Sequence, residues 1–133
     1  MERTETKSTQ IQAMKRVMIV DDMESSRNVI LRYFRGDFEF LIPKSEPEVM
    51  QQFKDKKPDA ILLDRMLWNG RHGDDFIEAF RKENPKIIIV MVSGSPERQE
   101  SLLQKGADAF FGKPVDLSRL RNYLKSKGLL SGK

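Results

Sequence analysis

Hydrophobic residues in this chain gather in short continuous runs, and the segments between the runs are mostly polar. Short continuous apolar runs are typical of parallel strands that are covered on both faces. The chain contains five such runs, at residues 16–21, 38–42, 60–64, 87–92 and 109–111. The fourth run is the richest in β-branched residues, which favours a central place in a sheet. The pattern therefore predicts five strands.

Between these runs, apolar residues recur at the spacing of one helix face. The predicted helices are marked by Val29, Ile30, Tyr33 and Phe34, by Val49, Met50 and Phe53, by Phe76, Ile77 and Phe80, by Leu102 and Leu103, and by Leu117, Leu120 and Leu124. Strands that alternate with helices are joined by right-handed crossovers, which place helices on both faces of a parallel sheet. We therefore predict an α/β fold, a doubly wound five-stranded parallel sheet flanked by five helices.

The length of 133 residues favours one domain with one core. Residues 1–13 are polar and hold a single candidate anchor, Ile11, so a flexible N-terminal leader is predicted there. The folded domain is expected over residues 14–128, and residues 129–133 are expected to form a short C-terminal tail.

Composition excludes several classes of protein. The chain has no cysteine, so neither a disulfide framework nor a cysteine-ligated zinc site can form. The longest apolar run, 87–92, is too short to span a bilayer, and the polar N-terminus lacks the apolar core of a signal peptide. A net charge of +4 is more typical of a solvated surface than of a nucleic-acid footprint. We therefore expect a cytoplasmic protein that binds neither membranes nor, directly, nucleic acid.

Polar and charged residues follow four of the five predicted strands. Asp21 and Asp22 end the first strand, and Asp64 ends the third. Ser93 follows the fourth strand and Lys113 follows the fifth. Because parallel strands place their carboxyl ends on one edge of the sheet, these side chains are expected to meet there. Any one of them could be a helix cap or a surface ion, but five residues on four strand ends favour a functional site.

The charges of this group indicate a chemistry. Three carboxylates held together repel one another, and a hard divalent cation such as Mg²⁺ would relieve that repulsion. The metal can hold a phosphate oxygen, while the lysine and the hydroxyl donate hydrogen bonds to the remaining phosphoryl oxygens. A carboxylate in that setting can attack phosphorus and form an acyl phosphate. The residues therefore predict an aspartate that accepts a phosphoryl group.

Four segments, VMIVDD, ILLDRM, MVSG and GADAFFGKP, resemble in order and spacing the receiver domain of bacterial two-component response regulators. The resemblance extends over residues 15–127 and implies the flavodoxin-like receiver fold. It also implies that Asp64 accepts a phosphoryl group from the phosphohistidine of a sensor histidine kinase or of a histidine phosphotransfer protein.

The resemblance further implies roles for the residues around the acceptor. Asp22 and Asp64 would bind Mg²⁺ directly, together with the main-chain carbonyl of Met66. Asp21 would act mainly through a metal-bound water, and Lys113 would contact the phosphoryl group.

Two more residues match the switching elements of the family. Ser93 would close onto the phosphoryl group after transfer, and Phe110 matches the aromatic residue that moves inward with it. Plain core packing is the alternative for Phe110. Lys113–Pro114 resembles a Lys-Pro pair whose peptide bond is often cis, with an ordinary trans turn as the alternative.

Three features depart from the family's pattern. Trp68 stands where members usually have proline, and Gly73 comes one place later than the usual glycine. The chain between Ser93 and Gly106 is two residues shorter than in typical members. Trp68 could anchor a partner or fold over the acceptor loop. His72, the only histidine, lies in a polar loop and is expected at the surface.

The expected function is signalling rather than turnover of a separate substrate. Phosphorylation would favour one of two arrangements of the face formed by the helix at Leu102, the strand at 109–111 and the last helix. That face would then bind an unknown downstream protein. The residues after the last helix are too few for a DNA-binding module, so a stand-alone receiver, monomeric or weakly dimeric, is expected.

Other interpretations remain. A degenerate receiver would act as a phosphorylation-independent protein-binding module, and the altered loops leave that alternative open. A haloacid-dehalogenase-like phosphatase would need an acid two residues after its nucleophile, where this chain has Met66. A flavodoxin-like cofactor binder would need a loop rich in glycine and hydroxyl groups after the first strand, where DDMESSR is acidic.

Overall fold

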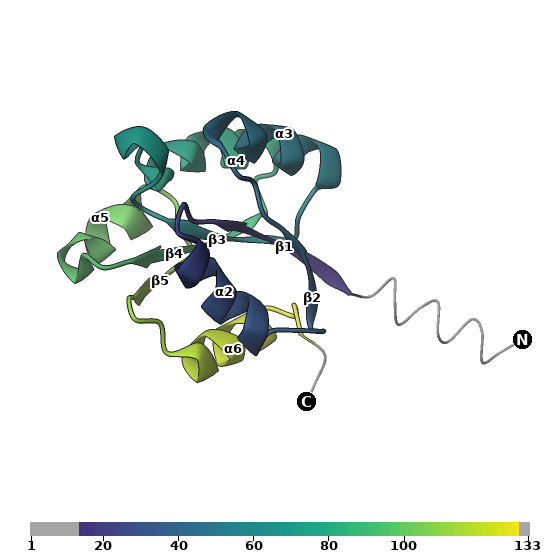
Figure 1. Ribbon diagram of the computed structural model, residues 1–133. Helices are drawn as coiled ribbons and strands as arrows, with labels where there is room; N and C mark the ends of the chain where they lie inside the picture. Colours follow the sequence, from purple (N-terminus) through teal and green to yellow (C-terminus); the bar gives the residue numbers. More distant parts are fainter. Residues whose placement is uncertain (1–13, 131–133) are drawn as a thin grey trace, which may run out of the picture.

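The structure, a computed structural model, describes residues 14–130. Within this range one sheet of five parallel strands lies between two layers of helices (Figure 1). The strands are β1 (Lys15–Val20), β2 (Phe38–Leu41), β3 (Ala60–Asp64), β4 (Ile88–Ser93) and β5 (Ala109–Gly112), in the order β2-β1-β3-β4-β5. The predicted α/β doubly wound fold is confirmed. The predicted leader, residues 1–13, lies outside the described residues.

The helices divide between the two faces of the sheet. α2 (Glu24–Tyr33) and α6 (Leu117–Ser126) cover one face, and α3 (Glu46–Lys56), α4 (Ile77–Glu83) and α5 (Gln99–Gln104) cover the other. The loops after β3 and β4 contain three 3₁₀ turns, η1 (Trp68–Gly70), η2 (Gly73–Phe76) and η3 (Pro96–Arg98). Among the described residues, no helix is both long and apolar enough to cross a membrane.

The strands divide their side chains between two cores. In β3, Leu63 belongs to the core of α3, α4 and α5, whereas Leu62 belongs to the core of α2 and α6. Successive strand residues point to opposite faces, and because both faces are covered, every residue of β3 is buried. Asp64 pairs with Val92 of the α2–α6 core, so the next residue, Arg65, is directed to the side of α4 and α5.

The buried stripe of α2 differs from the predicted one. Val29 and Tyr33 are predicted in the core, but they are 53% and 40% exposed. The buried positions are Arg27, Ile30 and Phe34, which lie on one face at the spacing i, i+3, i+7. Arg27 can occupy this face because its guanidinium donates a hydrogen bond to a backbone carbonyl at the end of β1.

Two other positions also differ from prediction. Leu103 is 37% exposed, so Leu102 is the single buried residue of α5. Leu129, which the sequence assigns to the tail, is buried in the α2–α6 core. The packed domain therefore extends past the predicted boundary at residue 128.

Candidate functional site

Four charged side chains meet at the carboxyl edge of the sheet. Asp21 and Asp22 follow β1, and Asp64 ends β3. A carboxylate oxygen of each of these acids lies within 4.8 Å of the others. Lys113, which follows β5, donates hydrogen bonds from Nζ to Asp64 Oδ2 at 2.8 Å and to Asp21 Oδ2 at 3.3 Å. The structure thus brings together the acids and the lysine that were predicted from the strand ends.

The loop after β1 fixes the first acid. Asp21 is buried, and its Oδ1 accepts a hydrogen bond from the backbone N–H of Met23 at 3.0 Å. Its backbone carbonyl accepts a hydrogen bond from the buried Arg27 guanidinium at 2.9 Å. Asp22 is exposed at the rim of the cluster. One acid is therefore held in place, while its neighbour faces the solvent from which a cation would arrive.

Asp64 is buried and accepts two hydrogen bonds. Lys113 Nζ binds Oδ2, and the backbone N–H of Met66 donates to Oδ1 at 3.3 Å. Burial raises the pKa of Asp64, and although the bond from Lys113 lowers it, repulsion from Asp21 helps to keep it above its usual value. Burial alone would lower the pKa of Lys113, but its bonds to the two carboxylates outweigh burial and raise it. The lysine therefore stays charged, but its single positive charge cannot neutralise three carboxylates.

Asp64→Asn is expected to stabilise the fold in the absence of divalent cations. The pKa of Asp64 is higher in the folded protein than in the unfolded chain. Ionisation of Asp64 therefore lowers the free energy of unfolding as pH rises from the unfolded-state pKa to the folded-state pKa, and the loss is complete above both values. Removing the charge should therefore raise the free energy of unfolding at neutral pH. Urea unfolding measures this gain, which should shrink towards about pH 3. An equal gain in Asp55→Asn, an exposed position on α3, would contradict the account.

Ser93 lies beside the site with its hydroxyl turned to its own loop. It is 3% exposed, and its Oγ accepts a hydrogen bond from the backbone N–H of Ser95 at 3.1 Å. The backbone N–H of Lys113 donates to the Ser93 carbonyl at 2.9 Å, which joins the ends of β4 and β5. Within residues 14–130, no hydrogen bond joins the Ser93 hydroxyl to Asp64 or to the Lys113 amine.

The other predicted residues lie around this edge. Phe110 and Trp68 are both partly buried against the core of α3, α4 and α5. This packing agrees with the core interpretation of Phe110 and with a Trp68 that folds onto its own domain. Met66 is 50% exposed, and it pairs with the partly buried His72 in an isolated antiparallel bridge that closes the acceptor loop. The Lys113–Pro114 peptide bond is cis.

The donor set of the acidic cluster fits Mg²⁺. Its three carboxylates offer only oxygen ligands, which this cation prefers, and they lie close enough to share one ion. The single lysine neutralises only part of their charge, so a bound divalent cation would relieve the remaining repulsion. The Met66 carbonyl remains a prediction as a further ligand.

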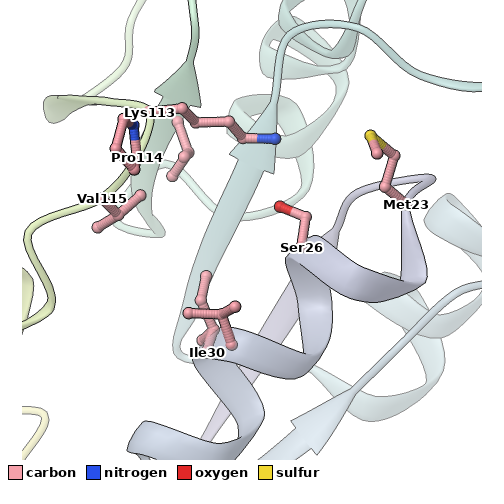
Figure 2. Close-up of a pocket in the computed structure, with 8 residues that line it drawn as sticks. Met23, Ser26, Ile30, Lys113, Pro114 and Val115 are labelled. Carbon is pink, nitrogen blue, oxygen red and sulfur yellow. The ribbon is translucent and has the colours of Figure 1, made fainter.

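A mainly apolar cavity of about 440 Å³ opens beside the lysine (Figure 2). Its lining comes from α2 and the residue before it, from β4, and from the loop after β5; it consists of Met23, Ser26, Val29, Ile30, Val92, Lys113, Pro114 and Val115. Met23 is 57% exposed, although its side chain is apolar. The charged cluster therefore adjoins a surface on which an apolar side chain of another protein could be buried.

Residues 17–125 match the family model of the response regulator receiver domain. The chain belongs to this family. The receiver is 28% identical, over 132 residues, to the protein-glutamate methylesterase/protein-glutamine glutaminase of Bacillus licheniformis, a match that covers 90% of the chain and 36% of that protein. It is 25% identical to the chemotaxis protein CheY of Halobacterium salinarum over 103 residues, 75% of the chain and 85% of CheY. A solved CheY-like receiver domain from Methanospirillum hungatei has a TM-score of 0.74 at 28% identity, covering 86% of the chain and 93% of that structure.

Membership of the family gives the receiver a phosphate-accepting role in two-component signalling. Receiver domains are signalling modules rather than turnover enzymes, and they bind Mg²⁺ at an acidic pocket of the kind formed here. They interact with histidine kinases or phosphotransfer proteins and with downstream targets. The receiver spans only about a third of the Bacillus protein, so the activity of that whole protein is not carried over.

Three residues near the site were not singled out from the sequence. Arg27 fixes the acidic loop, and Arg65 and Asp74 lie on the opposite side of the acceptor strand. Burial would raise the pKa of Asp74, but a hydrogen bond from Lys105 and the charges of Lys105 and Arg65 hold it below its usual value. In the sequence, Arg65 and Asp74 look like ordinary charged residues of a solvated loop. Nothing in the sequence pattern indicates that the fold buries them.

Proposed function

We propose that the receiver accepts a phosphoryl group on Asp64 from a phosphohistidine donor and then changes a surface that a downstream protein binds. The observation that supports this most strongly is one lysine in contact with two acids. Lys113 Nζ lies 2.8 Å from Asp64 Oδ2 and 3.3 Å from Asp21 Oδ2. The Lys113 amine can bind a phosphoryl group transferred to Asp64, because the amine already faces the carboxylate that would carry this group.

In the transfer, a carboxylate oxygen of Asp64 forms a bond to phosphorus while the bond from phosphorus to the donor nitrogen breaks. The nitrogen keeps the electron pair of the broken bond, and the product is an acyl phosphate. The Asp64 carboxylate is only partly stabilised by its neighbours, as its raised pKa indicates, which favours it as a nucleophile. Asp21, Asp22 and Asp64 would hold Mg²⁺, with the Met66 carbonyl as a further ligand, and the ion would draw charge from the phosphoryl oxygens.

The donor is proposed to be a protein, either a sensor histidine kinase or a histidine phosphotransfer protein. Two observations support a protein contact next to the acceptor. The apolar cavity lies directly beside Lys113, and Met23 and Val29 present apolar surface at its edge. An apolar contact of this kind would place a partner's histidine near Asp64, because the cavity and the acidic cluster share the lysine.

The surface of α5, β5 and α6 is proposed to be the one that changes. The Ser93 hydroxyl, which accepts from the N–H of Ser95, would turn to donate to a phosphoryl oxygen, and this would move the loop before η3. Phe110, partly buried on β5 next to β4, is the side chain whose packing would follow. A downstream protein would distinguish the two arrangements.

The metal requirement tests this proposal. Wild-type receiver incubated with Mg²⁺ and acetyl phosphate should gain the mass of one phosphoryl group, and chelation of Mg²⁺ beforehand should prevent the gain. Asp22→Asn should slow the gain by about tenfold, because it removes one of three candidate ligands. Asp55→Asn, on the exposed face of α3, is the matched control. A folded wild-type protein that gains no mass would instead favour the phosphorylation-independent binding module.

Substitutions at Met66 are expected to change the lifetime of the acyl phosphate. This side chain is 50% exposed, and its backbone N–H is bound to Asp64, so it lies where hydrolytic water would approach. An acid or amide there can orient that water, and Met66→Glu or Met66→Gln should change the hydrolysis rate by about tenfold. The decay of the mass adduct measures the rate. Met14→Glu, at the exposed start of the described residues, is the control, and identical decay in all these proteins would rule out the proposed role.

A further inference from the structure

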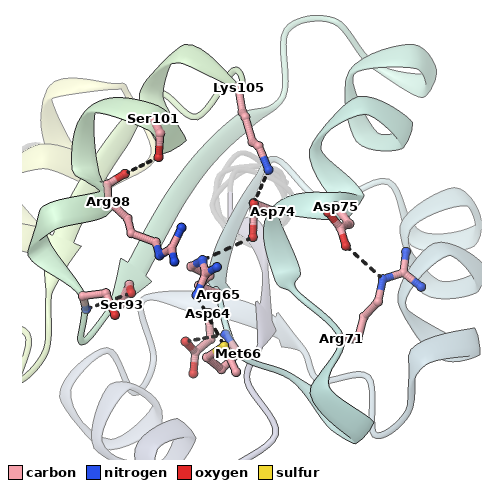
Figure 3. A network of polar contacts seen from close by, with 11 residues as sticks. Asp64, Arg65, Met66, Arg71, Asp74, Asp75, Ser93, Arg98, Ser101 and Lys105 are labelled. Carbon is pink, nitrogen blue, oxygen red and sulfur yellow. Dashed lines mark hydrogen bonds and ion pairs between the residues drawn. The ribbon is translucent and has the colours of Figure 1, made fainter.

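A second charged cluster lies on the other side of the acceptor strand. Arg65 follows Asp64, Asp74 lies in η2, and Lys105 follows the last residue of α5. Lys105 Nζ donates a hydrogen bond to Asp74 Oδ2 at 2.5 Å, and Arg65 Nε lies 3.8 Å from Asp74 Oδ1 (Figure 3). We name these three residues the Arg65–Asp74–Lys105 triad. It is separate from the acids and the lysine of the proposed phosphoryl site.

The contact between Arg65 and Asp74 is close but incomplete. The side chain of Asp74 is 4% exposed, and its Oδ1 has no hydrogen-bond partner within the described residues. The side chain of Arg65 is 11% exposed, and the hydrogen bond that its guanidinium makes is to the weak acceptor Met66 Sδ at 3.5 Å. Two nearly buried opposite charges therefore face each other without the hydrogen bond that would hold them together, so a modest change of the local field can move the arginine.

The backbones of these residues, in contrast, are fixed to the acceptor. The N–H of Gly73 donates to the carbonyl of Arg65 at 2.5 Å. A Cβ on Gly73 would lie 1.9 Å from the carbonyl oxygen of Asp64, so the two segments touch with no space for a side chain. Movement within the triad is therefore movement of the side chains, and Figure 3 shows the Arg65 guanidinium turned towards Asp74.

α5 is attached to the domain by few contacts. Five of its six residues are exposed, and Leu102 alone is buried. The ion pair of Lys105 with the buried Asp74 is a side-chain contact between the C-terminal end of this helix and η2. The N-terminal end follows η3, in the loop that begins at Ser93.

We propose that the Arg65–Asp74–Lys105 triad couples the charge on Asp64 to the position of α5. In the unphosphorylated receiver, Arg65 and Lys105 compete for one buried carboxylate. A phosphoryl dianion on Asp64 attracts the Arg65 guanidinium and moves it away from Asp74. Asp74 then pairs with Lys105 alone among the triad's cations, so that ion pair becomes stronger and the C-terminal end of α5 is held more tightly. This inference rests on the proposed acceptor role of Asp64.

Hydrogen exchange on the intact receiver tests the coupling. Exchange of the amides of residues 99–105 is measured with Mg²⁺, with and without acetyl phosphate, on samples whose adduct has been verified by intact mass. In the wild type, phosphorylation should slow this exchange by about threefold. In Lys105→Met and in Arg65→Met the adduct should still form, but it should slow exchange in this segment clearly less than in the wild type, because only the change proposed at Ser93 remains. Lys105→Arg, which keeps the charge, should restore the response.

The controls separate this coupling from a merely structural role. Lys54→Met removes an exposed lysine that lies 4.0 Å from Glu83 on α4, and it should leave the response of α5 unchanged. Lys105 is half-exposed, so its removal should leave the fold intact. A slowing of exchange in α5 that is as large in Lys105→Met and Arg65→Met as in the wild type would overturn the coupling while leaving the acceptor role of Asp64 standing. A folded wild type that forms no adduct would overturn both.

Discussion

Lys113→Met should slow the phosphorylation of the receiver by about a hundredfold at saturating Mg²⁺. Among the described residues, the amine is the one side-chain donor that contacts both Asp64 and Asp21, at 2.8 and 3.3 Å. Without it, the two buried carboxylates repel each other, and the charge that develops on the phosphoryl oxygens loses the amine that would offset it. The initial rate of mass gain with acetyl phosphate measures the loss.

Lys86→Met provides the matched control for that experiment. Lys86 is exposed and lies before β4, at the end of the strand opposite to the site. Its replacement should leave the rate unchanged. Circular dichroism verifies that both variants are folded, because removal of Lys113 also leaves buried carboxylates without their partner. Equal phosphorylation rates in the two folded variants would show that Lys113 does not act on the phosphoryl group.

Gly73→Ala should strongly destabilise the receiver, because it adds a methyl group where the structure has no space for one. The added Cβ would lie 1.9 Å from the carbonyl oxygen of Asp64 and 3.0 Å from its carbonyl carbon, and both are backbone atoms of a fully buried strand. Relief of that overlap requires β3 or η2 to move, with an expected loss of about 3 kcal/mol of unfolding free energy. Urea unfolding measures the loss.

Gly94→Ala is the control for this substitution. No atom lies within 4 Å of a Cβ built at Gly94, so the change should alter the unfolding free energy by less than about 0.5 kcal/mol. Where Gly73→Ala still folds, its phosphorylation should also be slower, because the strand end that carries Asp64 has been displaced. An unfolding midpoint equal to that of the wild type would mean that the close approach of η2 to β3 does not exist in solution.

The parts of the site that could be predicted are those that depend on strand topology. Parallel strands bring their carboxyl ends together, so Asp21, Asp64 and Lys113 follow from the order of strands and residues alone. The continuous apolar run before Asp64 likewise predicts its burial, which is complete along β3. The role of Ser93 stays a prediction, because within residues 14–130 its hydroxyl is bonded to the N–H of Ser95 and not to the acceptor carboxylate. The Met66 carbonyl also stays a prediction, as a ligand of the metal.

What could not be predicted depends on tertiary contacts between polar residues. Arg27 is buried on α2 because a backbone carbonyl accepts its hydrogen bond, whereas the more apolar Val29 faces solvent at the cavity beside Lys113. Asp74 is buried because Lys105, 31 residues later, supplies a counter-charge. Neither partner can be read from periodicity, since the spacing of apolar residues carries no information about which distant polar groups will meet.

The most direct test of the account is the site of the phosphoryl group. Wild type and Asp64→Asn are incubated with Mg²⁺ and acetyl phosphate, their intact masses are measured, and the wild-type adduct is located by peptide mass spectrometry. The account predicts one phosphoryl group on the wild type, on the peptide that contains Asp64, and none on the variant. A phosphoryl group of equal yield on Asp64→Asn, or on a wild-type peptide that lacks Asp64, would contradict it.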